Sequence, residues 1–125
     1  MAGYDTITFG GTTLTITNMR VRQVPATIKQ KVGRVLVQIP IIGRDALDYE
    51  FTISGYVTAA SLAALEAARD AIEALNDVEN HALVTGIASH VGNYIMIPDS
   101  LSWLDDSDDV QGLYKYSFIL IQYQQ

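Results

Sequence analysis

Residues Ser61–Leu75 read SLAALEAARDAIEAL, and residues Leu113–Tyr123 read LYKYSFILIQY. In the first segment, apolar residues recur at intervals of three and four, which is the spacing of one helix face. We therefore predict an amphipathic helix from about residue 59 to residue 75 that covers one face of a sheet. Its predicted core-facing stripe consists of Leu62, Leu65, Ala68, Ile72 and Leu75.

The second segment predicts a long β-strand at the end of the chain. It is rich in Tyr, Phe, Ile and Leu, and its C-terminal half is apolar on both faces. Such a strand needs cover on two sides, which is more than one small domain readily supplies. We therefore expect Phe118, Leu120 and Tyr123 to contribute to an interface between subunits.

Alternating polar and apolar residues predict further strands. Tyr4–Phe9 and Thr12–Thr17 form a predicted hairpin, because Gly10-Gly11 between them tolerates the positive φ angles of a two-residue turn. A third strand is predicted over Tyr49–Val57.

The remaining predicted strands are less regular. The nearly continuous apolar run Val35–Ile42 predicts a strand covered on both sides, with Pro40 at a sheet edge or bulge. His81–Gly86 and Asn93–Pro98 are predicted as short strands, the second continuing into Ser100–Leu104.

The chain has the size and composition of one compact domain. It has 125 residues, of which 49% are hydrophobic and 18% charged, and it shows no internal repeat or linker. We predict a single domain over residues 1–125 of the α+β class, mostly β. The predicted architecture is a small sandwich or barrel of antiparallel strands with one amphipathic helix packed on it.

Composition also excludes several classes of function. The chain contains no cysteine, which excludes disulfides, thiolate metal sites and a cysteine nucleophile. His81 and His90 lie outside any local frame that holds a nucleophile, so we expect no enzyme and no cofactor. The opening MAGYDTITFGG lacks a basic flank and an apolar core, so we expect a soluble protein without a secretion signal or a membrane partner.

Charge is divided unevenly along the sequence. The net charge is −6, but residues 1–44 contain six basic residues against Asp5 alone and carry +5, while the remainder carries −11. Such a chain is either bipolar in space, which suits copies docking head to tail, or simply has a solvated basic loop.

Most of these cations lie in Asn18–Arg34, a segment interrupted by Pro25 and Gly33. It fits a long β-hairpin, an extended arm ordered by a neighbouring subunit, or a surface loop. The basic residues predicted to lie at a subunit interface are Arg20, Arg22, Lys29, Lys31 and Arg34.

An acidic run near the C-terminus is the one candidate for a metal site. Asp105, Asp106, Asp108 and Asp109 could collect a hard cation, but they do not match an EF-hand loop. The competing interpretations are an exposed turn and a patch that meets cations of another subunit, so we predict no bound metal. Trp103 and its neighbouring tyrosines could likewise stack sugars, or belong to the core.

The order of these elements resembles the tail-tube-like domain of bacteriophage tails and contractile injection systems. It is similar in particular to the N-terminal ring-forming domain of distal tail proteins of the baseplate hub. The likeness lies in Tyr49–Tyr123, through FTISGYV, SLAALEAARDAIEAL, NYIMIPDSLSWL and LYKYSFILIQY. Distal tail proteins often add a second, galectin-like domain, for which this sequence has no room.

The resemblance implies a structural protein of the virion, assembled in the host cytoplasm. Its copies would close into a ring, commonly of six, around a channel that DNA crosses only as transient cargo. Its partners would be itself, in rings and stacked rings, and other tail or baseplate proteins. The alternative is a small monomeric β-rich module that binds a carbohydrate or a peptide.

Overall fold

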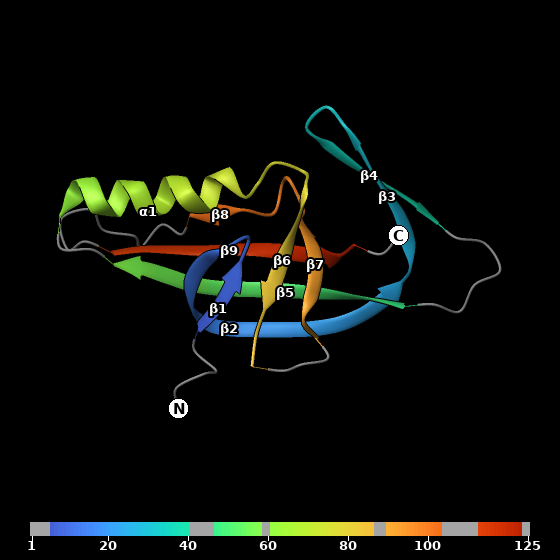
Figure 1. The fold of residues 1–125 in the computed structure, drawn as a ribbon, viewed down its shortest axis with the longest axis horizontal. Helices are drawn as coiled ribbons and strands as arrows, with labels where there is room; N and C mark the ends of the chain where they lie inside the picture. Colours follow the sequence, from blue (N-terminus) through green and yellow to red (C-terminus); the bar gives the residue numbers. More distant parts are fainter. Residues whose placement is uncertain (1–5, 41–46, 59–60, 87–89, 104–112, 124–125) are drawn as a thin grey trace.

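The computed structural model describes residues 6–40, 47–58, 61–86, 90–103 and 113–123. Most of these residues lie in strands, and they contain one α-helix of 13 residues, which confirms the predicted fold class (Figure 1). The elements are β1 (Thr6–Phe9), β2 (Thr12–Pro25), β3 (Thr27–Val32), β4 (Val35–Pro40), β5 (Leu47–Thr58), α1 (Leu62–Ala74), β6 (Asn80–Val84), β7 (Gly92–Met96), β8 (Ser102–Trp103) and β9 (Leu113–Gln122).

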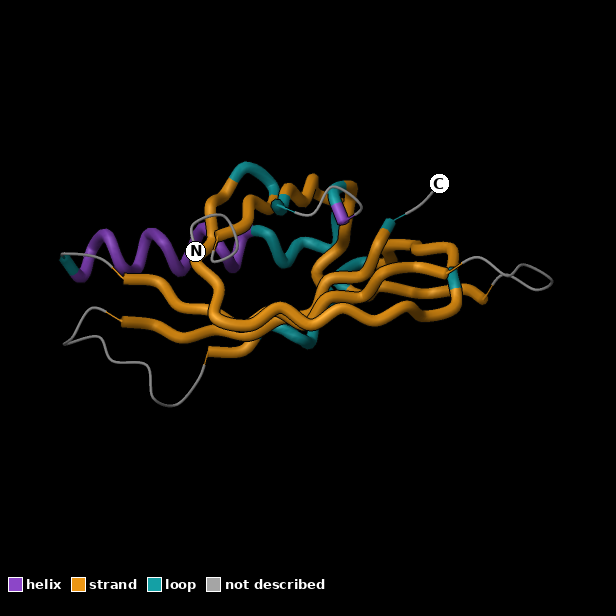
Figure 2. Tube along the Cα trace, turned by 90° about the horizontal axis from the view of Figure 1, so that it is seen from below, coloured by secondary structure: helices purple, strands orange, loops and turns teal. Residues whose placement is uncertain are grey.

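The main sheet closes on itself. Its strand order is β5-β2-β1-β6-β7-β9-β8, and β5 also pairs with β9, so six antiparallel strands form a barrel. The closing pair runs in register from Glu50↔Ile121 to Thr58↔Leu113. The long strands β2, β5 and β9 run beside one another, with α1 at one end of the layer they form (Figure 2).

The first hairpin follows the prediction. Gly10 and Gly11 join β1 to β2 with φ angles of 59° and 83°, values that glycine adopts without steric cost. The flanking pair Phe9↔Thr12 closes the ladder directly at this two-residue turn.

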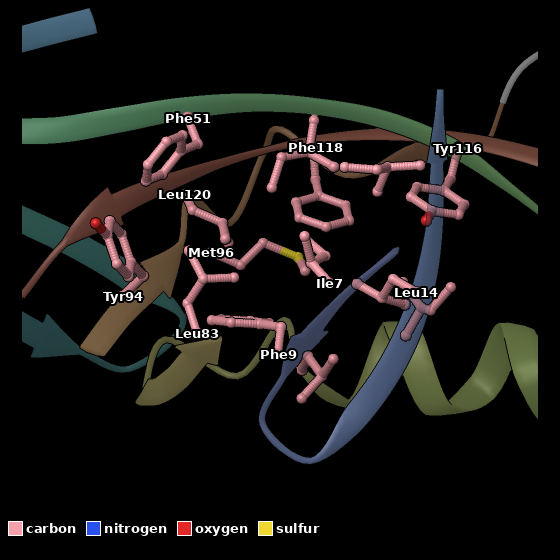
Figure 3. Packing of buried hydrophobic residues seen from close by; sticks show 14 residues of the cluster. Ile7, Phe9, Leu14, Phe51, Leu83, Tyr94, Met96, Tyr116, Phe118 and Leu120 are labelled. Carbon is pink, nitrogen blue, oxygen red and sulfur yellow. The ribbon is translucent and has the colours of Figure 1, made fainter. Parts of the chain in front are cut away.

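Aromatic and aliphatic side chains from the strands fill the barrel (Figure 3). Phe118 and Leu120 are fully buried in this core, so their predicted place at a subunit interface is wrong. Closure of the barrel covers one face of β9. On its other face, Ile121 is 1% exposed, so that face is partly covered by the chain itself. Tyr123 remains half-exposed.

The helix begins where the sequence offers a cap. Ser61 accepts a hydrogen bond from the Ala64 amide at 3.2 Å. Leu65, Ile72 and Leu75 are buried as predicted, but Leu62 is 52% exposed and does not pack into the core. The reason is position, because the first turn of α1 extends beyond the adjacent ends of β5 and β9 (Figures 1 and 2).

Gly55 is required where β5 passes β2 and β9. A Cβ at this position would lie 2.1 Å from the Thr15 carbonyl oxygen and 2.6 Å from Tyr116 Oη. We expect Gly55→Ala to lower the free energy of unfolding by about 2–3 kcal/mol, since a packed barrel resists added volume. Urea denaturation measures this change. The control is Gly92→Ala, where a Cβ would only touch Tyr94 at 3.9 Å; equal losses in both variants would contradict the explanation.

A buried and an exposed leucine on α1 provide a matched pair of variants. Leu65 is fully buried and Leu62 is 52% exposed on the same helix. We expect Leu65→Asp to unfold the barrel, because an unpaired buried carboxylate costs several kcal/mol. Leu62→Asp should leave the thermal unfolding midpoint within a few degrees of the wild type. Circular dichroism melts measure both, and a folded Leu65→Asp variant would refute this assignment of the helix faces.

Candidate assembly surface

Strands β3 and β4 form a hairpin outside the barrel. They make a separate two-stranded sheet, joined to β2 through Ala26 alone. Gly33 makes the turn between the strands with φ of 63°. Along the longest axis of the molecule, this hairpin occupies the half away from α1 (Figure 1). Of the interpretations of Asn18–Arg34, the long β-hairpin is therefore closest: the segment completes β2 and then forms β3 and the turn.

The two faces of this hairpin differ in chemistry. Its register pairs Ile28 with Ile39, Gln30 with Val37 and Val32 with Val35, and directly paired residues point to the same face. One face therefore carries five β-branched apolar side chains and one amide. We call this the hairpin face; it consists of Ile28, Gln30, Val32, Val35, Val37 and Ile39.

The apolar side chains of the hairpin face meet solvent. Their exposed fractions run from 36% at Val37 to 59% at Val35. The prediction that Val35–Ile42 is covered on both sides is thus wrong for the described residues of that range. The strand lies outside the barrel, so only its opposite face, with Leu36, is partly covered.

A buried ion pair holds the base of the hairpin on the barrel. Lys29 Nζ contacts the Asp48 carboxylate, and the two side chains are 0% and 1% exposed. Lys29 Nζ also donates to the Thr27 carbonyl oxygen at 3.0 Å. Lys29 therefore serves the chain's own fold, which corrects its predicted place at a subunit interface.

Two further predicted interface cations are paired within the chain. Arg22 Nε lies 2.6 Å from Glu50 Oε1, and Lys31 Nζ lies 2.8 Å from Glu79 Oε1 near the hairpin turn. Arg20 and Arg34 are exposed and form no ion pair within the described ranges. The basic segment is thus partly neutralised by the acidic remainder of the same chain.

Some buried polar atoms of the described residues lack a hydrogen-bond partner, and one of them belongs to the buried ion pair. Asp48 Oδ1, His90 Nδ1 and Tyr94 Oη are buried and find no hydrogen-bond partner in the described part of the chain. Burial, together with electrostatic interactions with Tyr49 and Asp48, raises the pKa of Tyr94 to about 12. The phenol therefore stays neutral at physiological pH. The rings of His90 and Tyr94 lie 4.9 and 5.2 Å from that of Phe51, so this region is an aromatic end of the core.

A groove of about 620 Å³ separates the hairpin turn from the segment that follows α1. Lys31 and Arg34 line one side, and Asn76, Asp77 and Val78 line the other. None of its described lining residues is aromatic. The groove is polar and of mixed charge, so it lacks the stacking platform that a sugar site uses.

The Trp103 side chain packs against residues of α1 and β9. The Arg69 guanidinium lies 5.0 Å from its ring centroid, and its Nε1 donates to Glu73 Oε1 at 3.1 Å. Tyr114 and Tyr116 meet it edge to face at 5.8 and 6.0 Å. These contacts connect β8 and β9 to α1, which weakens the proposed role of Trp103 as a stacking surface.

Other candidate sites gain no support. The aspartates Asp105, Asp106, Asp108 and Asp109 lie outside the described residues. Among the residues that are described, no group of three His, Asp or Glu side chains could hold a metal. The described helix is too short to cross a bilayer.

Comparison with known families adds no identification. Neither protein-family models nor curated proteins give a match to this chain. The hairpin face was missed by sequence reasoning. Its signal was the alternation of Ile28 and Val32 with polar residues before Gly33, and of Val35, Val37 and Ile39 after it.

The buried ion pair predicts a distinctive pattern of stability. We expect Lys29→Met to lower the free energy of unfolding by about 3–5 kcal/mol, because it leaves the Asp48 carboxylate buried and unpaired. The double variant Lys29→Met/Asp48→Leu should recover most of that loss, since burying an apolar pair carries no desolvation penalty. Urea titrations measure the cycle. Additive losses in the double variant would show that the two residues do not act as a pair.

Proposed function

We propose that this chain is a structural, non-enzymatic subunit of a phage tail or a related injection machine. Its copies form a homo-oligomeric ring around a DNA-conducting channel, as a tail-tube, distal-tail or baseplate component. The observation that carries the proposal is the exposed hairpin face. A monomer that leaves five neighbouring β-branched residues in water carries an association surface.

The physics of small sheets supports this proposal. An isolated two-stranded hairpin is at best marginally stable in water and needs a further layer on its apolar side. Within the described residues, no segment of the same chain supplies that layer, because all five apolar residues stay exposed. A layer from another copy is the economical source, since every copy carries the same unsatisfied face.

A ring is favoured over a two-fold dimer by the unlike ends of the molecule. The hairpin occupies one half of the long axis and α1 the other (Figure 1). A contact between unlike surfaces closes into a ring when its rotation closes. By the family resemblance the ring is a hexamer in the virion, assembled in the host cytoplasm. It stacks on further rings and contacts other tail or baseplate proteins.

The second candidate is a monomeric module that binds a peptide or a carbohydrate. The groove of about 620 Å³ beside the hairpin turn is the feature that favours it. Its mixed charge suits a polar peptide better than a sugar. This candidate leaves the hairpin face unexplained, so we favour the ring subunit.

Polar replacement of the hairpin face tests the proposal. We expect Val32→Thr/Val35→Thr to raise the protein concentration needed for assembly by about tenfold. Each lost methyl contact is worth about 0.8 kcal/mol, and about 1.4 kcal/mol is a factor of ten. Threonine keeps the β-branched shape, so folding should persist. Light scattering coupled to size-exclusion chromatography, with negative-stain imaging, measures assembly.

The matched control is Val84→Thr, which changes a 51% exposed valine on β6. This control should assemble as the wild type does. A wild-type protein that stays monomeric at all accessible concentrations would contradict the proposed function. Equal effects of both variants would contradict the assignment to the hairpin face.

A further inference from the structure

The outer face of α1 is the counterpart that the hairpin face lacks. Ala63, Glu66, Ala67, Asp70 and Ala74 recur at intervals of three and four and are all exposed. They form a stripe, here called the helix outer face, opposite the buried Leu65 and Ile72. Three of its five side chains are alanine, and its two acids form no ion pair within the described ranges.

We infer that the hairpin face of one copy docks on the helix outer face of the next copy. The inference rests on the ring assembly proposed above and names the surfaces that make it. It commits to a second copy of this chain as the occupant of the hairpin face.

The two surfaces match in shape. Six residues per strand make the hairpin about 20 Å long, at 3.3 Å per residue. The 13 residues of α1 also span about 20 Å, at 1.5 Å per residue. A helix packed on a sheet is a standard two-layer arrangement, and it supplies the cover that a lone hairpin needs.

The two surfaces also match in charge. Arg34 stands exposed in the hairpin turn without an ion pair among the described residues, and Arg20 lies exposed on β2. Glu66 and Asp70 are the exposed acids of the helix outer face. Opposite charges on two docking surfaces fix the direction of the contact and speed its formation. Two hairpin faces docked on each other would leave these acids unused.

A single chain cannot make this contact with itself. The buried ion pair Lys29–Asp48 holds the base of the hairpin on the barrel, and Lys31 pairs with Glu79 near the turn. The groove of about 620 Å³ separates its turn from the end of α1. The contact is therefore between unlike surfaces of two copies, as a closed ring requires.

Cysteine cross-linking tests this contact cleanly, because the chain has no native cysteine. Val35→Cys places a thiol on the hairpin face and Ala67→Cys places one on the helix outer face. A disulfide requires Cα atoms within about 7 Å, so it reports direct contact. We expect an equal mixture of the two variants to form a covalent dimer under mild oxidation. A mixture of Val84→Cys with Ala67→Cys should give at least tenfold less.

A second variant tests the same contact without relying on the position of two sulfur atoms. Ala67→Arg should fold normally, because arginine is a good helix former at an exposed site. Its bulk on the helix outer face should raise the assembly concentration at least tenfold. Circular dichroism melts check its folding, and negative-stain imaging checks its assembly.

The outcomes separate this inference from the ring proposal. Rings that form in the wild type while Ala67→Arg assembles normally would overturn the docking and leave the ring proposal standing. A Val35→Cys variant that cross-links mainly with itself would show hairpin-to-hairpin pairing, and would likewise overturn it. A wild-type protein that never assembles would refute both proposals.

Discussion

The pairing of β5 with β9 is the interaction on which the rest of the structure depends. It turns an open sheet into a barrel and gives each of the two strands a partner on both edges. The closure tolerates no side chain at Gly55, because Tyr116 Oη donates to the Thr15 carbonyl oxygen at 2.7 Å directly over that position. This side-chain-to-backbone hydrogen bond links β9 to β2 across β5 at one point.

Closure also decides which surfaces are left for other molecules. The fold buries Tyr114, Tyr116, Phe118, Leu120 and Ile121, so most of the described apolar side chains of β9 are covered by the chain itself. The hairpin of β3 and β4 lies outside the barrel, so the apolar residues of its hairpin face stay exposed. Folding also pairs several charged residues with one another. Arg22, Lys29 and Lys31 find acids within the chain, so a sequence divided into basic and acidic parts becomes a less divided surface.

Local sequence patterns predict the helix and strands better than they predict which side chains are buried. The Gly10-Gly11 turn, the helix and the long last strand follow from spacing and turn chemistry, which act over a few residues. Alternation shows that a strand has two different faces, but not which face meets water. That is why alternation alone predicts cover on both sides of Val35–Ile42 and an interface position for Phe118. The ion pair of Lys29 with Asp48 joins residues 19 apart through the fold, and no local signal marks it.

That ion pair gives the hairpin a fixed orientation at a cost in stability. A well-packed apolar pair of similar volume would stabilise the base of the hairpin as well or better, so the charges contribute specificity rather than strength. They allow one arrangement of the hairpin on the barrel, whereas apolar contacts tolerate sliding. A hairpin held in one orientation loses less conformational freedom when a neighbouring copy docks on it. Under the proposed assembly, the buried ion pair therefore serves folding and association together: it holds the hairpin on the barrel and presents the hairpin face in the geometry that the next subunit meets.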